Sequence, residues 1–133
     1  MVGLLIISHC DLGRELLNAA KLILGKLDNA DSVCISSTDK SEELLEDISN
    51  KLKTLDKGKG VLILTDMFGG TPSNLSLSFL QDDRVEVLTG VNLPMVIAVA
   101  QDRGQLSLAE LGRRAQDAGR RSIALASNLL KEE

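Results

Sequence analysis

Residues 60–74 read Gly60-Val61-Leu62-Ile63-Leu64-Thr65-Asp66-Met67-Phe68-Gly69-Gly70-Thr71-Pro72-Ser73-Asn74, and this stretch decides the fold class. Its apolar first part is too short for a helix and predicts a strand that is covered on both faces, as in a parallel sheet. A polar turn with two glycines follows. Thr71 is then expected to be the N-cap of a helix, with Pro72 at its first position. A buried strand that passes through a glycine turn into a helix is typical of an α/β fold.

The same alternation extends in both directions from this stretch. Further strands are predicted at 2–8, 32–36 and 84–88, and helices at 12–24, 41–55, 71–80, 94–101 and 107–119. Ser107 and Glu110 form a predicted capping box for the last of these helices. Residues 122–126 fit either a small terminal strand, which we favour, or more helix. We therefore expect one α/β domain over residues 1–133, with an open, mainly parallel sheet of four strands flanked by helices.

Composition excludes several classes of function. The net charge is −4, from 15 basic and 19 acidic residues, which argues against a nucleic-acid partner. Cys10 and Cys34 lack zinc-ligand spacing, and two such thiols indicate a reduced, cytoplasmic protein without a metal. No apolar run approaches the roughly 18–20 residues of a membrane span. Nucleotide-binding fingerprints are missing as well, so no cofactor is expected.

Polar residues gather where the predicted strands end. The first strand ends in Ser8-His9-Cys10-Asp11, the third ends at Asp66, and the fourth leads into Thr89-Gly90-Val91-Asn92. Sites in open parallel sheets lie beyond the carboxyl ends of the strands. If the first and third strands are neighbours, His9 and Asp66 meet there. A carboxylate that accepts the proton of one imidazole nitrogen leaves the other nitrogen free to attack an electrophile.

The turn after Asp66 has the features of an anion site. Gly69 and Gly70 leave backbone N–H groups unshielded before a helix N-terminus, which favours a phosphate. Thr71 and Ser73 add hydroxyl groups, and we include Asn92 among the predicted phosphoryl-binding residues. Together with His9 and Asp66 as the catalytic pair, this set suits phosphoryl transfer, which depends mainly on positioning and charge stabilisation.

Position alone also allows simpler interpretations. His9 fits a surface turn, and Asp66 fits a residue that hydrogen-bonds its own turn. The glycine run fits an ordinary loop into a helix. Met67 and Phe68 fit either packing under the loops or a surface that faces a partner.

The chain resembles the IIA component of the mannose-type sugar phosphotransferase system. The resemblance is carried by residues 6–9 followed by Leu12-Gly13, by residues 60–74, and by Thr89-Gly90-Val91-Asn92-Leu93-Pro94-Met95. It implies a cytoplasmic phosphoryl carrier that accepts a phosphoryl group from phospho-HPr on His9, with Asp66 orienting the ring, and passes it to a IIB component. It also implies a homodimer in which a short antiparallel fifth strand, at 122–126 here, is exchanged between subunits.

The sequence departs from the family pattern at two places near the site. Phe68 stands where some relatives have Trp, and Cys10 stands where relatives often have Gly, which leaves the choice of partner open. A dihydroxyacetone kinase phosphotransfer subunit and a non-transporting regulatory module switched by His9 phosphorylation remain alternatives. A small-molecule phosphatase is disfavoured, because no Arg lies in the three loops to clamp a phosphate, and Arg14 falls on the first helix.

Overall fold

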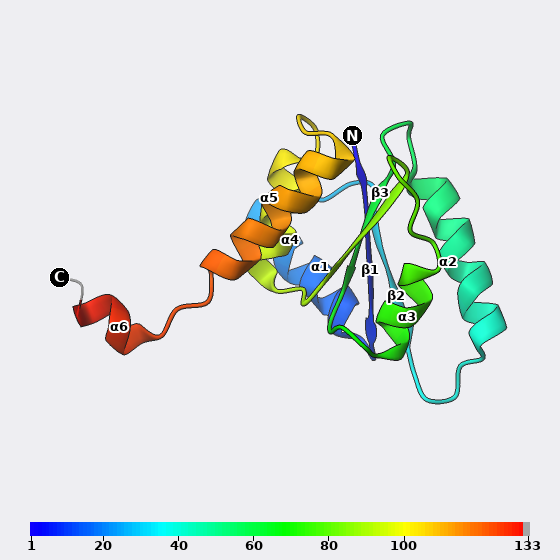
Figure 1. Cartoon of the computed structure of the whole chain (residues 1–133), viewed down its shortest axis with the longest axis horizontal. Helices are drawn as coiled ribbons and strands as arrows, with labels where there is room; N and C mark the ends of the chain where they lie inside the picture. The colour runs from blue at the N-terminus through cyan, green and yellow to red at the C-terminus, as the bar shows by residue number, and fades with distance from the viewer. Residues whose placement is uncertain (132–133) are drawn as a thin grey trace.

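A computed structural model describes residues 1–131 of the chain (Figure 1). Four strands alternate with helices, followed by further helices at the carboxyl end. In chain order the elements are β1 Gly3–His9, α1 Leu12–Leu24, β2 Ala30–Ile35, α2 Ser41–Leu55, β3 Val61–Thr65, α3 Thr71–Leu77, β4 Val85–Thr89, α4 Leu93–Asp102, α5 Leu108–Arg121 and α6 Ala126–Lys131. The α/β class predicted from the sequence is confirmed.

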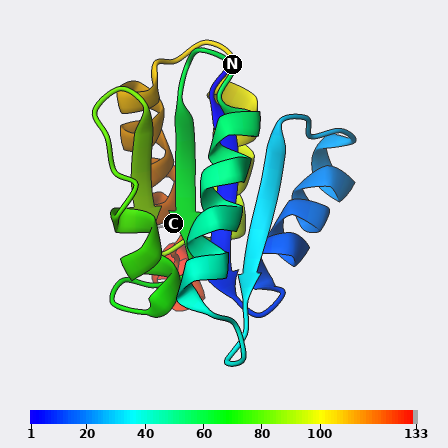
Figure 2. The ribbon, with the colours of Figure 1, turned by 90° about the vertical axis from the view of Figure 1, so that its right-hand side faces the viewer.

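The sheet has the strand order β2-β1-β3-β4, and all three neighbouring pairs are parallel (Figure 2). The chain moves outward from β1 to β2 on one side and from β3 to β4 on the other. The strand order therefore reverses between β1 and β3, which is the point where open α/β sheets bind ligands. Ile7 of β1 is in register with Thr65 of β3. The next residues along the two strands bring His9 and Asp66 to this switch point.

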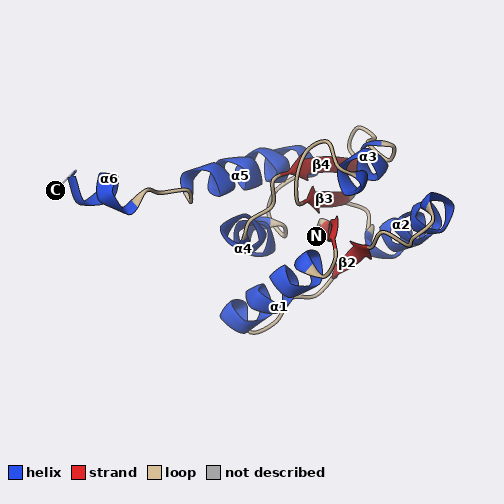
Figure 3. Cartoon of the chain, turned by 90° about the horizontal axis from the view of Figure 1, so that it is seen from below, coloured by secondary structure: helices blue, strands red, loops and turns tan. Residues whose placement is uncertain are grey.

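Helices cover both faces of the sheet. Helices α1, α4 and α5 lie on one face, and α2 and α3 lie on the other (Figure 3). Successive side chains of a strand point to opposite faces. Leu4 and Ile6 accordingly pack with the first helix layer, while Leu5 and Ile7 pack with the second. The continuous apolar run of β1 follows from this double coverage, as in other parallel sheets.

Three details of helix termini differ from the sequence prediction. The N-cap of α3 is Gly70, without a side-chain capping bond, so the prediction of Thr71 as the cap was wrong by one residue. Helix α3 also ends at Leu77 rather than near residue 80, and α5 continues past Gly119 to Arg121. The predicted capping box is confirmed: Ser107 accepts from the Glu110 N–H, and the Glu110 carboxylate accepts from the Ser107 N–H.

The strand predicted at 122–126 is absent from this single chain. Residues 122–125 form a loop, and α6 follows, leading away from the body of the molecule (Figure 1). A strand needs a neighbour for its backbone hydrogen bonds, and within residues 1–131 this segment has left both edges of the sheet. Its large apolar side chains are exposed: Ile123, Leu125, Leu129 and Leu130. Among residues 1–131, no helix is long and apolar enough to cross a membrane.

Candidate functional site

His9 and Asp66 form a close pair at the carboxyl edge of the sheet. His9 Nδ1 lies 2.8 Å from Asp66 Oδ2, and the backbone N–H of His9 donates to the same oxygen at 2.8 Å. Side-chain exposure is 48% for His9 and 10% for Asp66, so the ring faces solvent while its partner is set into the surface. The contact expected from neighbouring first and third strands is therefore present.

The protonation of Asp66 fixes the direction of this hydrogen bond. Burial by itself raises the pKa of Asp66, but the hydrogen bonds from the backbone and ring of His9 and from the Met67 N–H outweigh it and leave this pKa below its usual range. The Met67 N–H lies 2.9 Å from Asp66 Oδ1, so the carboxylate also hydrogen-bonds its own turn. An ionised carboxylate is an acceptor only. Nδ1 of His9 is therefore the donor of this hydrogen bond, and in the neutral form of the ring Nε2 has the free electron pair.

Gly70 supplies the space that the His9 ring occupies. A Cβ atom at Gly70 would lie 2.9 Å from Cε1 and 3.4 Å from Nε2 of His9. Gly69, the preceding residue, has a φ of +93°, in the left-handed region that favours glycine. The glycine pair thus turns the chain at its first residue and passes closely beside the imidazole at its second. The sequence connected both glycines with an anion site or an ordinary loop, and this steric role was missed.

The N-terminus of α3 lies beside the same ring. The Asn74 N–H bonds to the Gly70 carbonyl at 2.9 Å, and the N–H groups before it in the helix begin without helical acceptors. The Thr71 side chain is exposed, whereas Ser73 is buried. Within residues 1–131, the hydroxyl groups of Ser73 and Thr65 are buried without a hydrogen-bond partner. Of the predicted cradle, Gly70 contacts the ring, Gly69 and Thr71 are exposed, and Ser73 is buried.

Asn92 is engaged by the protein itself. Its Oδ1 accepts from the Met95 N–H at 3.0 Å, which caps α4, and its Nδ2 donates to the Gly119 carbonyl at 3.1 Å and to Ser122 Oγ at 3.3 Å. These contacts join α4 to the end of α5. The predicted phosphoryl-binding residue is therefore held in a junction between helices.

Two neighbours of His9, to which the sequence analysis gave no structural role, hold the end of β1 in place. Ser8 Oγ accepts from the Gly13 N–H at 2.8 Å, which joins the strand to the first turn of α1. Cys10 has a φ of +50° and donates its N–H to Ile35 of β2. The available signal was a buried polar residue, Ser8, at the end of an apolar strand.

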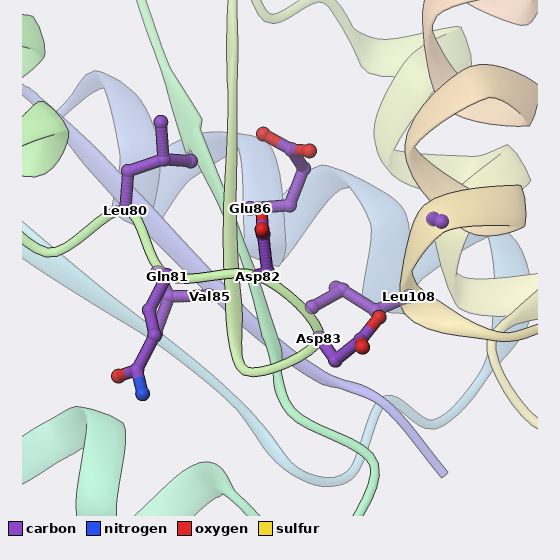
Figure 4. Close-up of a pocket in the computed structure, with 8 residues that line it drawn as sticks. Leu80, Gln81, Asp82, Asp83, Val85, Glu86 and Leu108 are labelled. Carbon is purple, nitrogen blue, oxygen red and sulfur yellow. The ribbon is translucent and has the colours of Figure 1, made fainter.

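The histidine stands on an open surface. A hollow of about 330 Å³, lined by Leu80, Asp82, Asp83 and Glu86 among others, lies at the opposite, amino end of β4 (Figure 4). His9 does not line it. The described residues 1–131 contain no group of three or more His, Cys, Asp or Glu side chains that could hold a metal ion. An exposed ring outside such a hollow is better suited to contact with a macromolecule than to enclosure of a small substrate.

The fold and this site place the chain among α/β domains that have a histidine–aspartate pair at the switch point of a parallel sheet. A sequence model of one family, described as the PTS system fructose IIA component, matches residues 3–116. The chain belongs to this family, and its role is in phosphotransfer within a sugar phosphotransferase system.

Similar proteins agree with this assignment. The fructose-specific EIIA component of Bacillus subtilis is 30% identical over 99% of this chain and 91% of its own length. The mannose-specific EIIAB component of Escherichia coli K12 is 32% identical over 92% of this chain, and the match covers 38% of the length of that protein. Among solved structures, a IIA protein associated with the fucose utilization operon of Streptococcus pneumoniae is 27% identical, with a TM-score of 0.82 and coverage of 98% and 99% of the two chains. The EIIA component of Streptococcus agalactiae shares the fold, with a TM-score of 0.87 at 23% identity over 96% and 99%.

Proposed function

We propose that the chain, as a single IIA domain, is a cytoplasmic phosphoryl carrier that accepts a phosphoryl group from phospho-HPr on Nε2 of His9 and passes it to a IIB component. The observation that carries this proposal is the 2.8 Å contact between His9 Nδ1 and Asp66 Oδ2 at an exposed edge of the sheet. It occupies one ring nitrogen and leaves the other available.

The transfer is balanced without an added base. The electron pair of Nε2 forms the new N–P bond while the bond between phosphorus and the donor breaks, and the donor keeps that electron pair. The ring then carries a positive charge and retains its proton on Nδ1, beside the ionised Asp66. A carboxylate at this distance stabilises the cationic ring. In the second transfer the N–P bond breaks toward the IIB acceptor, and His9 returns to its neutral form.

The elements around His9 support the phosphoryl group. Gly70 leaves the ring and the group next to it unhindered, and the start of α3 presents backbone N–H groups at the same edge. Such groups interact favourably with an anion. Thr71 adds an exposed hydroxyl group that can donate to a phosphoryl oxygen. Orientation by Asp66 and charge stabilisation by the turn are together sufficient for a carrier, since the partner proteins supply the other reacting groups.

The test is incubation with phosphoenolpyruvate, enzyme I and HPr. We expect one acid-labile phosphate per chain, located by ³¹P NMR on Nε2 of His9, and its discharge when a IIB protein is added. His9→Ala should take up none. Cys10→Gly is the matched control, because glycine accepts the φ of +50° at that position and leaves the pair untouched.

An unlabelled native chain, or equal labelling of His9→Ala, would disprove the proposal. If the phosphorylated chain transfers its phosphoryl group to a dihydroxyacetone kinase subunit and not to a IIB protein, the chain is the phosphotransfer subunit of such a kinase. Phosphorylation without discharge to either would indicate the regulatory module.

A homodimer belongs to the same proposal. Large apolar side chains are exposed at Ile123, Leu125, Leu129 and Leu130. Such a patch is typical of an interface, and we assign this interface to a second copy of the chain. The oligomeric state tests this part of the proposal separately from the phosphorylation of His9.

A further inference from the structure

Asn92 lies where three parts of the chain meet at the carboxyl edge of the sheet. Its carbonyl oxygen caps α4 through the Met95 N–H, and its amide nitrogen reaches Gly119 near the end of α5 and Ser122 at 3.1 and 3.3 Å. Ser122 Oγ itself donates to the Gly119 carbonyl at 2.7 Å. Ser122 is also the first residue of the C-terminal segment, residues 122–131, whose large apolar side chains are exposed. One side chain therefore joins α4, α5 and that segment.

Hydrogen bonds, rather than close packing, connect the parts of this junction. A Cβ atom at Gly119 would lie 2.7 Å from Met95 Cε, so the Met95 side chain fills the space between α5 and α4 at that point. Asn92, Met95 and Gly119 also line a hollow of about 250 Å³ beside Ile123. A movement at the end of α5 therefore reaches Asn92 through the hydrogen bonds of its amide nitrogen to Gly119 and Ser122.

The other side of Asn92 leads to the histidine–aspartate pair. Asn92 follows Gly90 and Val91, whose N–H groups both donate to the Thr65 carbonyl, at 3.0 and 2.9 Å. Thr65 is the last residue of β3, and its carbonyl carbon is bonded to the nitrogen of Asp66. The loop before α4 thus holds the peptide group from which Asp66 projects.

We propose that Asn92 is a positioning residue for the transfer site, through which the end of α5 and the C-terminal segment set the position of Asp66 and of the His9 ring. The inference deepens the proposed phosphoryl transfer and rests on it. It has a functional consequence: a second copy of the chain that covers the C-terminal segment and fixes Ser122 changes the rate of phosphorylation at His9 without touching the ring.

Three variants separate the contacts of Asn92. Asn92→Asp keeps an oxygen that can cap α4 but has no N–H to donate toward Gly119 and Ser122. Ser122→Ala removes one of these acceptors and leaves Asn92 intact. Ser107→Ala is the matched control, because it removes a helix cap from α5 at the opposite edge of the sheet.

Two measurements are made on each variant: the rate of phosphorylation by phospho-HPr, and the ¹⁵N chemical shifts of the His9 ring. We expect Asn92→Asp to lower the rate about tenfold, since small displacements of reacting groups are costly, and to shift the Nδ1 resonance. Ser122→Ala should change both in the same direction by less. The double variant should be no worse than Asn92→Asp, because both act through one contact. Ser107→Ala should lower the melting temperature and leave both readouts unchanged.

Each other outcome overturns the inference. If Asn92→Asp leaves both the rate and the ring shifts unchanged, Asn92 is only a helix cap, because aspartate keeps the capping oxygen. If Asn92→Asp lowers the rate while Ser122→Ala leaves the rate and the ring shifts unchanged, the amide instead contacts the phosphoryl group directly, as the sequence alone suggested. A native chain that takes up no phosphate refutes the proposed function, while the ring spectra still report whether Asn92 positions the pair.

Discussion

At the scale of single residues, the site depends on Gly70, which has no side chain and so leaves room for the His9 ring. The His9 ring packs against the backbone of Gly70, where a Cβ atom would be 2.9 Å from Cε1. Real Cβ contacts do not reach this distance, so an alanine at position 70 must displace the ring or the turn. The turn carries the start of α3, and the ring is fixed to Asp66, so either movement separates Nε2 from the groups that serve it.

Gly70→Ala should therefore lower the rate of phosphorylation of His9 by at least about tenfold with little loss of stability. Gly104→Ala is the matched control, because Gly104 has no atom within 4 Å of the added Cβ and no positive φ. The rates are compared with phospho-HPr as donor, and folding is followed by thermal denaturation. Equal rates for the two variants would show that the ring has room to move without cost.

Asp66 predicts a particular pH dependence of stability. Its pKa lies below the usual value of about 3.9 in the folded chain, because hydrogen bonds from His9 and Met67 outweigh the effect of burial. A carboxyl group with a depressed folded pKa adds stability above its unfolded pKa, and this contribution disappears as the pH falls through the folded value. Asp66→Asn should therefore unfold more easily than the native chain at pH 7, and the difference should shrink below about pH 4.

Urea unfolding at a series of pH values between 7 and 3 measures this difference. Asp66→Asn should also phosphorylate at least about tenfold more slowly at pH 7, since the ring loses an ionised partner. Asp82→Asn, at the far end of β4, is the control for removing one negative charge. A stability difference that is constant across the pH range would contradict the assigned role of the hydrogen bonds to Asp66.

Residue-scale contacts differ in how far the sequence predicts them. The contact between His9 and Asp66 follows from the parallel pairing of β1 and β3, because the carboxyl ends of parallel strands lie at the same edge of the sheet. The fit of Gly70 against the ring depends on how α3 packs, and the hold of Asn92 on Gly119 depends on where α5 passes. Periodicity predicts that a helix exists but not where it packs, so only the structure reveals these two contacts.

At the scale of elements, the turn between β3 and α3 presents large apolar side chains beside the histidine. Met67 and Phe68 are exposed by 54% and 73%. Both follow Asp66 directly, so a protein that delivers a phosphoryl group to His9 must approach them. Buried aromatic and methionine side chains are common anchors of protein interfaces. We infer that a transfer partner covers this turn.

Replacing Met67 and Phe68 together by alanine should raise the KM for phospho-HPr about tenfold or more, with the melting temperature nearly unchanged. Leu22→Ala is the matched control, because Leu22 of α1 is an exposed apolar residue away from the turn. Steady-state transfer at varied phospho-HPr gives KM and kcat separately. An unchanged KM for the double variant would leave these side chains without a role in docking.

The sequence predicted the identity of most elements better than their limits. Helix α1 ends before Gly25 as expected, because glycine there adopts a φ of +87°. Helix α3 is shorter than predicted: Ser78, Phe79 and Leu80 donate instead to carbonyls three residues earlier, in tighter turns. The strand predicted at 122–126 failed in the single chain for another reason. Strand formation depends on a neighbour, and local sequence does not specify one.

At the scale of the whole molecule, helices cover both faces of the sheet, but the C-terminal extension, residues 123–131, has exposed apolar side chains. Side chains of this size bury favourably, at about 1.5–3 kcal/mol each. Beside the start of the extension, a hollow of about 250 Å³ between β4 and α5 is lined by Leu88, Met95 and Ile123 among others. The edge of β4 therefore has room for an added segment. The C-terminal extension is such a segment, and its large apolar side chains remain exposed in its own chain.

The dimer that we propose therefore depends on residues after Ser122. We expect the full chain to sediment as a dimer at micromolar concentration, and a chain that ends at Ser122 to sediment as a folded monomer. This truncation retains the serine that bonds to Asn92, so it removes the apolar extension without the junction. Ile123→Asp in the full chain should weaken the dimer in the same direction, because burial of an unpaired charge is costly. Leu22→Asp introduces the same charge at an exposed apolar position on α1 and should leave the dimer intact. A full chain that sediments as a monomer would instead make the extension a binding segment for another protein.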